Sequence, residues 1–202
     1  MTLPPPPDVR GFLSNAEGWH LHELAHYAAP IGSLLEIGSY CGRSTIWLGT
    51  AAKAHGSVVF ALDHHRGSEE HQPGEMFHDH ALVDERGCVD TLREFRRNIA
   101  RAGLDDTVIG VVASTAMVAL YWRPDQLGMV FIDGGHSLEA ALADWRAFGT
   151  KVSPGGILAI HDVFPDPAEG GQAPFTLWRM ALASGLFEEY SHCQSLRALK
   201  RI

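Results

Sequence analysis

The sequence has few of the features that mark secreted or membrane-spanning proteins. Only three of its 202 residues are cysteines, and Cys41, Cys88 and Cys193 lie too far apart to indicate a disulfide framework or a cysteine metal site. No apolar run is long enough to cross a bilayer. The N-terminus lacks the basic and apolar regions of a signal peptide. We therefore expect reduced thiols and a cytoplasmic location.

Basic residues are also scarce. Sixteen lysines and arginines stand against 24 aspartates and glutamates, which gives a formal net charge of -8. Such a surplus of negative charge repels nucleic acids and anionic membranes, so we expect neither as a partner. The remaining composition, 46% hydrophobic and 20% charged, is typical of one globular domain.

The sequence predicts one domain that is preceded by a short N-terminal arm. Four consecutive prolines at 4–7 predict an extended segment, so we assign 1–10 to a flexible arm and 11–202 to a single domain. Strand and helix patterns alternate through that domain without internal repeats. This predicts an α/β fold, a Rossmann-like doubly wound sheet of seven strands, mostly parallel with an antiparallel strand in a C-terminal hairpin.

Hydrophobic periodicity and capping signals place the elements. Ser14 and Glu17 form a capping box that begins the first helix. The long polar segment 64–87 predicts an acceptor-binding lid or, alternatively, a solvated insertion, and 166–174 predicts a second flexible loop at the same edge. Helices are expected over 15–28, 43–54, 88–102, 115–122, 138–149 and 175–184. Strands are expected over 34–37, 58–62, 108–113, 129–132, 157–160, 187–191 and 196–202.

The domain is organised around segment 34–49, which reads LLEIGSYCGRSTIWLG. An apolar run ends at Gly38 and a helix-compatible stretch follows Gly42, the strand–turn–helix form in which glycines let the backbone approach a nucleotide. The spacing is not that of dinucleotide-binding loops, and Glu36 places a carboxylate at the strand end. A carboxylate there suits a cation and repels a phosphate. These residues favour a positively charged nucleoside cofactor, S-adenosylmethionine.

The stretch LEIGSYCGRST resembles the first motif of class I S-adenosylmethionine-dependent O-methyltransferases, especially that of catechol O-methyltransferase. The stretches FIDGGHSLEAALADW and GGILAIHDV are similar to those of metal-dependent bacterial sugar O-methyltransferases, of the macrolide-sugar and mycobacterial methylmannoside types. The resemblance extends from about Gly11 to the C-terminus. It implies methyl transfer to a hydroxyl of a sugar, a sugar-derived small molecule or an oligosaccharide.

The residues expected to bind the cofactor are identified from their positions at strand ends and from the resemblance to methyltransferases. Asp63 ends the second strand, where an acidic residue can bind both hydroxyls of a ribose. The resemblance implies that Ser114 contacts the adenine side. The expected cofactor-binding residues are Glu36, Gly38, Tyr40, Gly42, Ser44, Asp63, Ser114 and Asp133.

Three residues at the ends of the fourth and fifth strands are expected to bind a metal. Asp133 and Asp162 offer carboxylate oxygens at one sheet edge, which suits a divalent cation and above all Mg²⁺. Either one alone would be explained as a turn cap. His161 stands where the resembling enzymes have a carboxylate ligand. It can bind through nitrogen, shift the preference toward Mn²⁺ or not bind. The third protein ligand is therefore open, with Glu69 or Glu70 as a further candidate.

His136 is the candidate general base, because it lies three residues after Asp133 and its unperturbed pKa is near neutrality. The resembling sugar enzymes have histidine at this position and catechol O-methyltransferase has lysine, which favours a sugar acceptor. A catechol or phenol acceptor is the alternative, with Phe164, Phe175 and Trp178 as pocket residues. A non-catalytic cofactor-binding module is an alternative of another class. We expect a homodimer.

A further motif points to different chemistry. His22-Glu23-Leu24-Ala25-His26 matches the H-E-x-x-H pattern of zinc proteases, in which two ligands share one helical face. Twelve histidines make a chance match unsurprising, and no third ligand follows at the spacing of those proteases. We therefore expect a partly exposed helix with histidines that face solvent.

Overall fold

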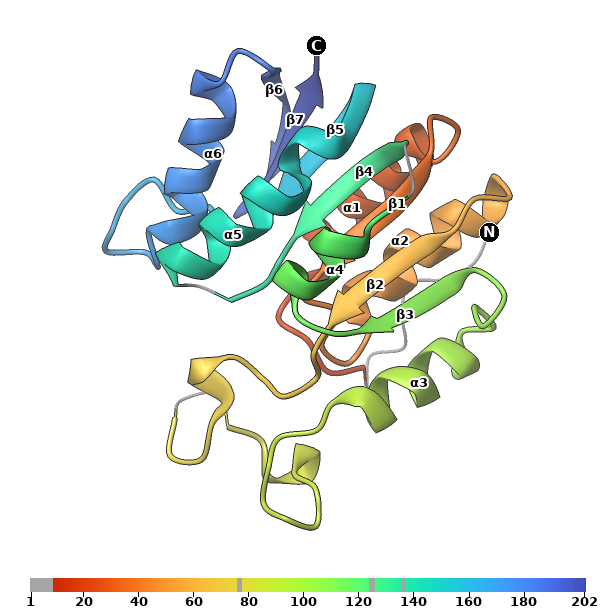
Figure 1. Cartoon of the computed structure of the whole chain (residues 1–202), viewed down its shortest axis with the longest axis vertical. Coiled ribbons are helices and arrows are strands. Elements are labelled where there is room, and N and C mark those ends of the chain that lie inside the picture. Colours follow the sequence, from red (N-terminus) through yellow and green to blue (C-terminus); the bar gives the residue numbers. More distant parts are fainter. Residues whose placement is uncertain (1–8, 76–77, 124–125, 136) are drawn as a thin grey trace.

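The structure, a computed structural model, describes residues 9–75, 78–123, 126–135 and 137–202. Seven strands form one sheet in the order β3-β2-β1-β4-β5-β7-β6 (Figure 1). The neighbours from β3 to β5 pair in parallel, whereas β7 runs antiparallel to β5 and β6. This confirms the doubly wound sheet with an antiparallel strand in its C-terminal hairpin.

The bounds of most elements agree with the sequence pattern within a few residues. The strands are β1 (Ser33–Ile37), β2 (Val59–Asp63), β3 (Val108–Val112), β4 (Leu127–Ile132), β5 (Val152–Ile160), β6 (Phe187–Cys193) and β7 (Leu196–Arg201). The α-helices are α1 (Asn15–Ala28), α2 (Arg43–Ala54), α3 (Leu92–Arg101), α4 (Thr115–Tyr121), α5 (Leu138–Phe148) and α6 (Ala173–Ala183). Short 3₁₀ helices are η1 (Glu69–His71), η2 (His80–Leu82) and η3 (Gly149–Lys151).

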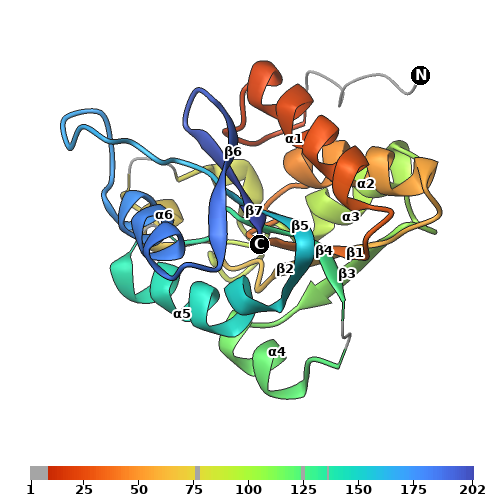
Figure 2. The ribbon, with the colours of Figure 1, turned by 90° about the horizontal axis from the view of Figure 1, so that it is seen from above.

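Helices cover both faces of the sheet, with α1, α2 and α3 on one face and α4, α5 and α6 on the other (Figure 2). Neighbouring residues of a strand point to opposite faces, so Leu34 joins the core under α1 and α2 while Leu35 joins the core under α5 and α6. Every residue of the central strand β4 is buried, as expected for a parallel strand covered on both sides.

The expected starts of two elements were wrong. Helix α3 begins at Leu92 and not at Cys88, because the Cys88 backbone N–H donates to Asp84 and Val89 pairs with Val83. Strand β5 begins at Val152 and not at 157, and a register shift against β4 accommodates the additional residues.

The last residues of the expected arm contribute to the folded body. Val9 is 3% exposed and belongs to the core cluster beneath α1 and α2. Arg43, the first residue of α2, donates hydrogen bonds to the carbonyls of Val9 and Leu13. Arg10 Nε lies 2.8 Å from Asp79 Oδ2. Residues 1–8 of the arm lie outside the described residues.

The H-E-x-x-H motif lies on the face of α1 that borders α2. His22 is half-buried, with Nδ1 3.0 Å from the Trp47 carbonyl, so the expectation that it faces solvent was wrong. His26 is exposed and Nδ1 lies 2.8 Å from His55 Nε2. Over the described part of the chain, neither motif histidine belongs to a group of three ligand atoms close enough to hold a metal.

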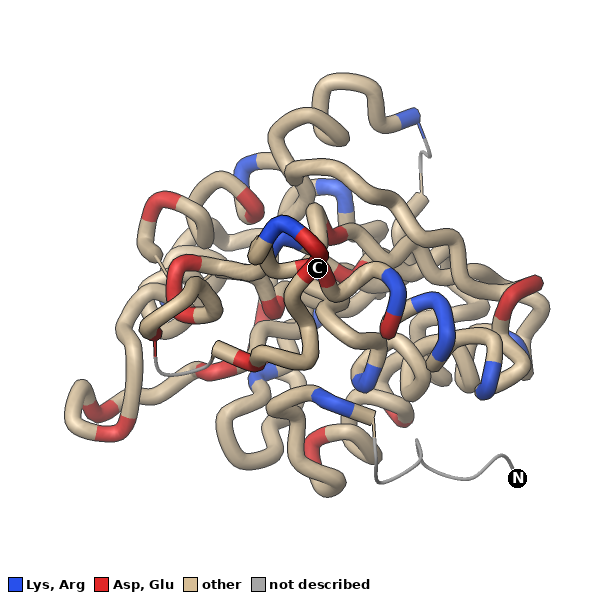
Figure 3. The backbone as a smooth tube through the Cα atoms, turned by 90° about the horizontal axis from the view of Figure 1, so that it is seen from below, with Lys and Arg blue, Asp and Glu red and all other residues tan. Residues whose placement is uncertain are grey.

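Acidic and basic residues are interspersed along the backbone in the view of Figure 3. Within the described ranges, each helix is too short or too polar to cross a membrane.

Candidate active site

A cavity of about 640 Å³ lies at the carboxyl ends of the parallel strands. Its wall includes the β1–α2 turn and residues that follow β2, β3, β4 and β5. Doubly wound sheets bind ligands at this edge, and the volume is that of a small-molecule site. Six of the expected cofactor-binding residues line it, namely Gly38, Tyr40, Ser44, Asp63, Ser114 and Asp133.

The β1–α2 turn brings two strand ends into contact. Gly38 has φ +93°, and a Cβ at this position would lie 2.1 Å from the Asp133 carbonyl oxygen. Only glycine fits there, because a side chain would be strained by its backbone conformation and would also collide with the end of β4. The turn thus places the expected cofactor loop directly beside the expected metal ligand Asp133.

Two expected cofactor-binding residues lie behind the turn and do not line the cavity. Glu36 is fully buried, and its carboxylate accepts hydrogen bonds from the hydroxyls of Ser44 and Thr45. Burial raises the pKa of Glu36 to about 8, so this side chain is not the exposed carboxylate that we expected. Gly42 packs against α3, where a Cβ would lie 3.3 Å from Phe95.

Asp63 is held rigidly at the cavity wall. One carboxylate oxygen accepts the backbone N–H of Tyr40 at 2.8 Å, and the other accepts that of His65 at 2.7 Å. Each oxygen keeps a further lone pair, so the carboxylate can still accept from ligand hydroxyls. Ser114 caps α4 by accepting the Met117 N–H at 3.4 Å, and its exposed side chain faces the cavity.

The three expected metal ligands converge. Donor atoms of Asp133, His161 and Asp162 all lie within 4.8 Å of one another. His161 Nδ1 is 3.1 Å from Asp133 Oδ1 and 3.4 Å from Asp162 Oδ2. In an octahedral site with bonds of about 2.1 Å, neighbouring ligand atoms are about 3 Å apart, so the donor set and its spacing fit a divalent cation.

The charge around His161 is strongly negative. Burial acts to lower the pKa of His161, but Asp133, Asp162 and Glu17 outweigh it and raise the pKa to about 12. Glu69 and Glu70 line the cavity but do not belong to the metal-ligand group found among the described residues. His136, the expected base, lies outside the described residues, so its role stays a prediction.

The sequence pattern did not identify two buried acids near the cavity. Glu17 Oε2 lies 3.4 Å from His161 Nε2, although the capping box accounted only for its contact with Ser14. Asp144 of α5 lines the cavity, and burial raises its pKa to about 6. Capping and helical patterns describe local neighbours, so neither reveals a contact with a distant strand end.

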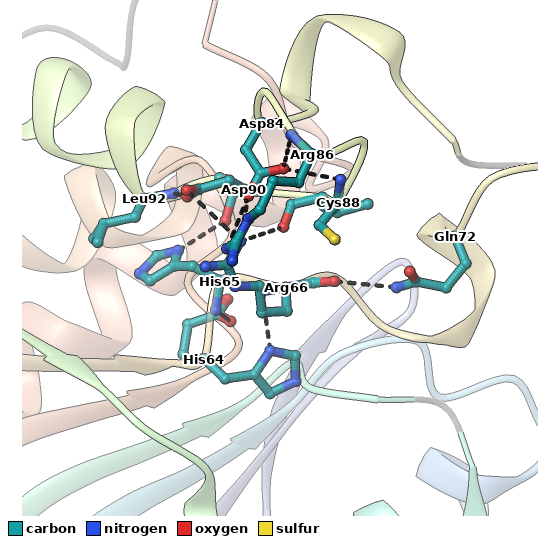
Figure 4. A network of polar contacts seen from close by, with 12 residues as sticks. His64, His65, Arg66, Gln72, Asp84, Arg86, Cys88, Asp90 and Leu92 are labelled. Atoms are coloured by element: carbon teal, nitrogen blue, oxygen red, sulfur yellow. Dashed lines mark hydrogen bonds and ion pairs between the residues drawn. The ribbon is translucent and has the colours of Figure 1, made fainter.

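Residues 64–75 and 78–91 belong to a segment that projects beyond β2, and residues 67–71 of it line the cavity (Figure 1). Arg66 Nη1 lies 3.2 Å from Asp84 and 3.8 Å from Asp90, and Gln72 donates to the Arg66 carbonyl at 3.0 Å (Figure 4). These contacts fold the described part of the segment against itself, and its role as an acceptor-binding lid or a solvated insertion stays a prediction.

The aromatic residues considered for a phenol pocket lie elsewhere. Phe175 and Trp178 stack with ring centroids 5.6 Å apart and pack against the core under α5 and α6. Neither they nor Phe164 line the cavity. The aromatic rings at the cavity are instead those of Phe12 and Tyr40, 5.9 Å apart, with His71 beside them.

The sheet order and the cavity at its carboxyl edge define a Rossmann-like methyltransferase fold. A family model described as a methyltransferase domain matches residues 35–163, which is more than half of the chain. The chain belongs to this family and is a methyltransferase.

Solved structures share the fold at low sequence identity. The O-methyltransferase NovP is 18% identical, with a TM-score of 0.69 over 90% of this chain and 78% of that chain. The O-methyltransferase from Bacillus cereus in complex with SAH is 18% identical, with a TM-score of 0.63 over 96% and 84%. TomG from Streptomyces achromogenes, an O-methyltransferase in complex with SAM, is 17% identical, with a TM-score of 0.60 over 96% and 82%.

Proposed function

We propose that this methyltransferase uses S-adenosylmethionine to methylate a hydroxyl of a sugar or sugar-derived small molecule, with assistance from a divalent cation. One observation carries the proposal. A single cavity brings the β1–α2 turn and Asp63 together with the ligand group of Asp133, His161 and Asp162. A cofactor site and a candidate metal site that share one wall suit methyl transfer to an acceptor hydroxyl held between them.

The charge of the cavity wall supports a sulfonium cofactor. Six acidic side chains line the cavity, against two arginines, Arg10 and Arg43. Such a wall attracts a cation and disfavours a nucleotide phosphate. The acids are Asp63, Glu69, Glu70, Asp133, Asp144 and Asp162. The SAH and SAM complexes of the Bacillus cereus enzyme and TomG, which share the fold, support the same cofactor.

The protein's own part in the reaction is to position groups and move one proton. Asp133 and Asp162 would hold the cation through oxygen and His161 through Nδ1, with Mg²⁺ the expected ion. When bound, the cation lowers the pKa of a coordinated hydroxyl. His136 is proposed to take that proton. The cavity wall then holds the acceptor oxygen in line with the methyl group, so that the O–C bond forms as the S–C bond breaks.

The sugar acceptor is proposed on the resemblance of segments 131–145 and 155–163 to those of sugar O-methyltransferases. Phe164, Phe175 and Trp178 do not line the cavity, whereas Phe12 and Tyr40 do, so a phenol acceptor is the alternative. A homodimer and an oligosaccharide acceptor remain predictions. A cytoplasmic location is also proposed, since all three cysteines are free thiols.

A methyl-transfer assay with labelled S-adenosylmethionine tests the proposal. Sugars, phenols and thiols are compared as acceptors, each with Mg²⁺ and with EDTA. We expect transfer to sugars that is abolished by EDTA and by Asp162→Ala, while S-adenosylhomocysteine still binds. Asp105→Ala, at an exposed position away from the cavity, serves as the control. Full turnover in EDTA would remove the metal from the mechanism.

The same assay distinguishes the proposed enzyme from a cofactor-binding module without catalytic activity. A cofactor-binding module predicts that S-adenosylhomocysteine binds while no acceptor is methylated. The proposed base predicts a large loss of turnover in His136→Ala, about 10²–10⁴-fold, with cofactor affinity retained.

A further inference from the structure

We propose that Glu17 is a positioning residue of the metal site, which orients His161 so that Nδ1 of its ring serves as the third protein ligand. The inference rests on the proposed metal-assisted function and deepens it, because it names the third ligand and the group that orients it.

The two ring nitrogens of His161 face different partners. Nδ1 lies 3.1 Å from Asp133 Oδ1 and 3.4 Å from Asp162 Oδ2, on the side of the cavity. Nε2 lies 3.4 Å from Glu17 Oε2, on the side of α1. His161 is 4% exposed, so the ring has no solvent around it in which to turn. Nδ1 thus neighbours the two aspartates of the site, whereas Nε2 makes no hydrogen bond within the described residues and has the Glu17 carboxylate at ion-pair distance.

Glu17 is itself held in place by segments that are distant in sequence. It is 4% exposed. Its Oε1 accepts the backbone N–H of Ser195 at 3.0 Å and the Ser195 hydroxyl at 2.7 Å. Its Oε2 accepts the Ser14 N–H at 3.1 Å. The turn between β6 and β7 and the start of α1 therefore fix this carboxylate against the His161 ring.

A capping role explains only part of this arrangement. In a capping box the glutamate needs only to reach back to the N-cap N–H, which Glu17 does through Oε2. Neither the burial of the side chain nor its bond to Ser195 follows from that role. A carboxylate behind a ligating imidazole has another known effect: it fixes the tautomer and the ring orientation of the ligand.

The test measures metal binding directly. Mn²⁺ is titrated into the wild-type protein, Glu17→Gln and His161→Ala, with free Mn²⁺ followed by its EPR signal. We expect Glu17→Gln to weaken Mn²⁺ binding about 10–100-fold, and His161→Ala to weaken it at least as much. Ser14→Ala is the matched control, because it loses the N-cap hydroxyl and keeps the backbone N–H that binds Glu17. Its Mn²⁺ affinity should equal that of the wild type.

A second readout distinguishes positioning from general destabilisation. A nitrogen ligand favours Co²⁺ over Mg²⁺, so loss of the oriented imidazole should lower the affinity for Co²⁺ more than that for Mg²⁺. A purely structural role would lower both affinities equally. If Glu17→Gln does not fold, Glu17→Asp replaces it, because it keeps the charge and withdraws the carboxylate by one methylene group. Intermediate Mn²⁺ affinity is then expected.

The outcomes separate the two proposals. If wild-type protein binds Mn²⁺ and a folded Glu17 variant binds it equally well, the positioning role is wrong and the metal-assisted function stands. If wild-type protein binds no divalent cation, both the positioning role and the metal part of the proposed function are wrong.

Discussion

A buried carboxyl group at the end of β1 makes folding stability depend on pH. Glu36 is fully buried, and its pKa is about 8 in the folded protein, against an ordinary value of 4.5. Between these two values the folded chain carries a proton on Glu36 that the unfolded chain lacks. The contribution of Glu36 to stability therefore falls as pH rises through that window.

Glu36→Gln should remove this dependence, because the amide has nearly the same shape and does not titrate. The free energy of unfolding, measured with urea at several values between pH 5 and pH 8, should fall less steeply in the variant. The difference in slope should approach about 1.4 kcal/mol per pH unit. Glu188→Gln, at an exposed position of β6, should keep the wild-type slope. Equal slopes in wild type and Glu36→Gln would contradict the assignment.

At the scale of elements, the contact between the β1–α2 turn and the end of β4 decides whether the cavity forms. Gly38→Ala should destabilise the protein by about 2–4 kcal/mol, because it combines an unfavourable φ with a collision against the Asp133 carbonyl. Gly171→Ala is the control: nothing lies within 4 Å of its would-be Cβ. Thermal denaturation of both variants is the measurement, and similar melting temperatures would refute the claim.

Arg10, which lines the cavity, joins the N-terminal segment to the segment after β2 through Asp79, 2.8 Å away. Both side chains are more than a third exposed, so the pair should contribute at most about 1 kcal/mol to stability. Arg10→Ala should leave the melting temperature almost unchanged while raising the KM for the acceptor by a few fold.

A double-mutant cycle provides the control for that pair. If the two residues act only through their contact, Arg10→Ala combined with Asp79→Ala should raise KM no more than either change alone. Additive effects on KM would show that the two residues act independently.

At the scale of the whole molecule, ligand binding should stabilise the folded protein. S-adenosylhomocysteine at about 100 times its Kd stabilises by about 2.7 kcal/mol, which raises the melting temperature by about 5–10 °C for a chain of this size. Differential scanning fluorimetry measures the shift. ATP at the same concentration should give none, because its phosphates face an acidic wall. An equal shift with ATP would contradict the proposed cofactor class.

The sheet and its carboxyl edge could be predicted because their signals are local. Three apolar runs of the sequence end where strands of the structure end. They are the run before Gly38 in β1, the β-branched run before Asp63 in β2 and the run before Asp133 in β4. The alternation of strands with helices then implied that these ends meet. The beginning of α3 was missed because Cys88 and its neighbours pair with the lid, and helical periodicity contains no information about that pairing.

By itself the sequence determined the fold class, the position of the cofactor turn and the identity of the converging residues Asp133, His161 and Asp162. Tertiary structure alone decided which of the expected site residues reach the cavity. It buried Glu36 beneath the β1–α2 turn. It also brought Glu17 to the side of the His161 ring that faces α1, although 144 positions separate 17 from 161. The physical reason is that propensity and periodicity act between chain neighbours. Burial and charge pairing depend on packing between α1 and the end of β5.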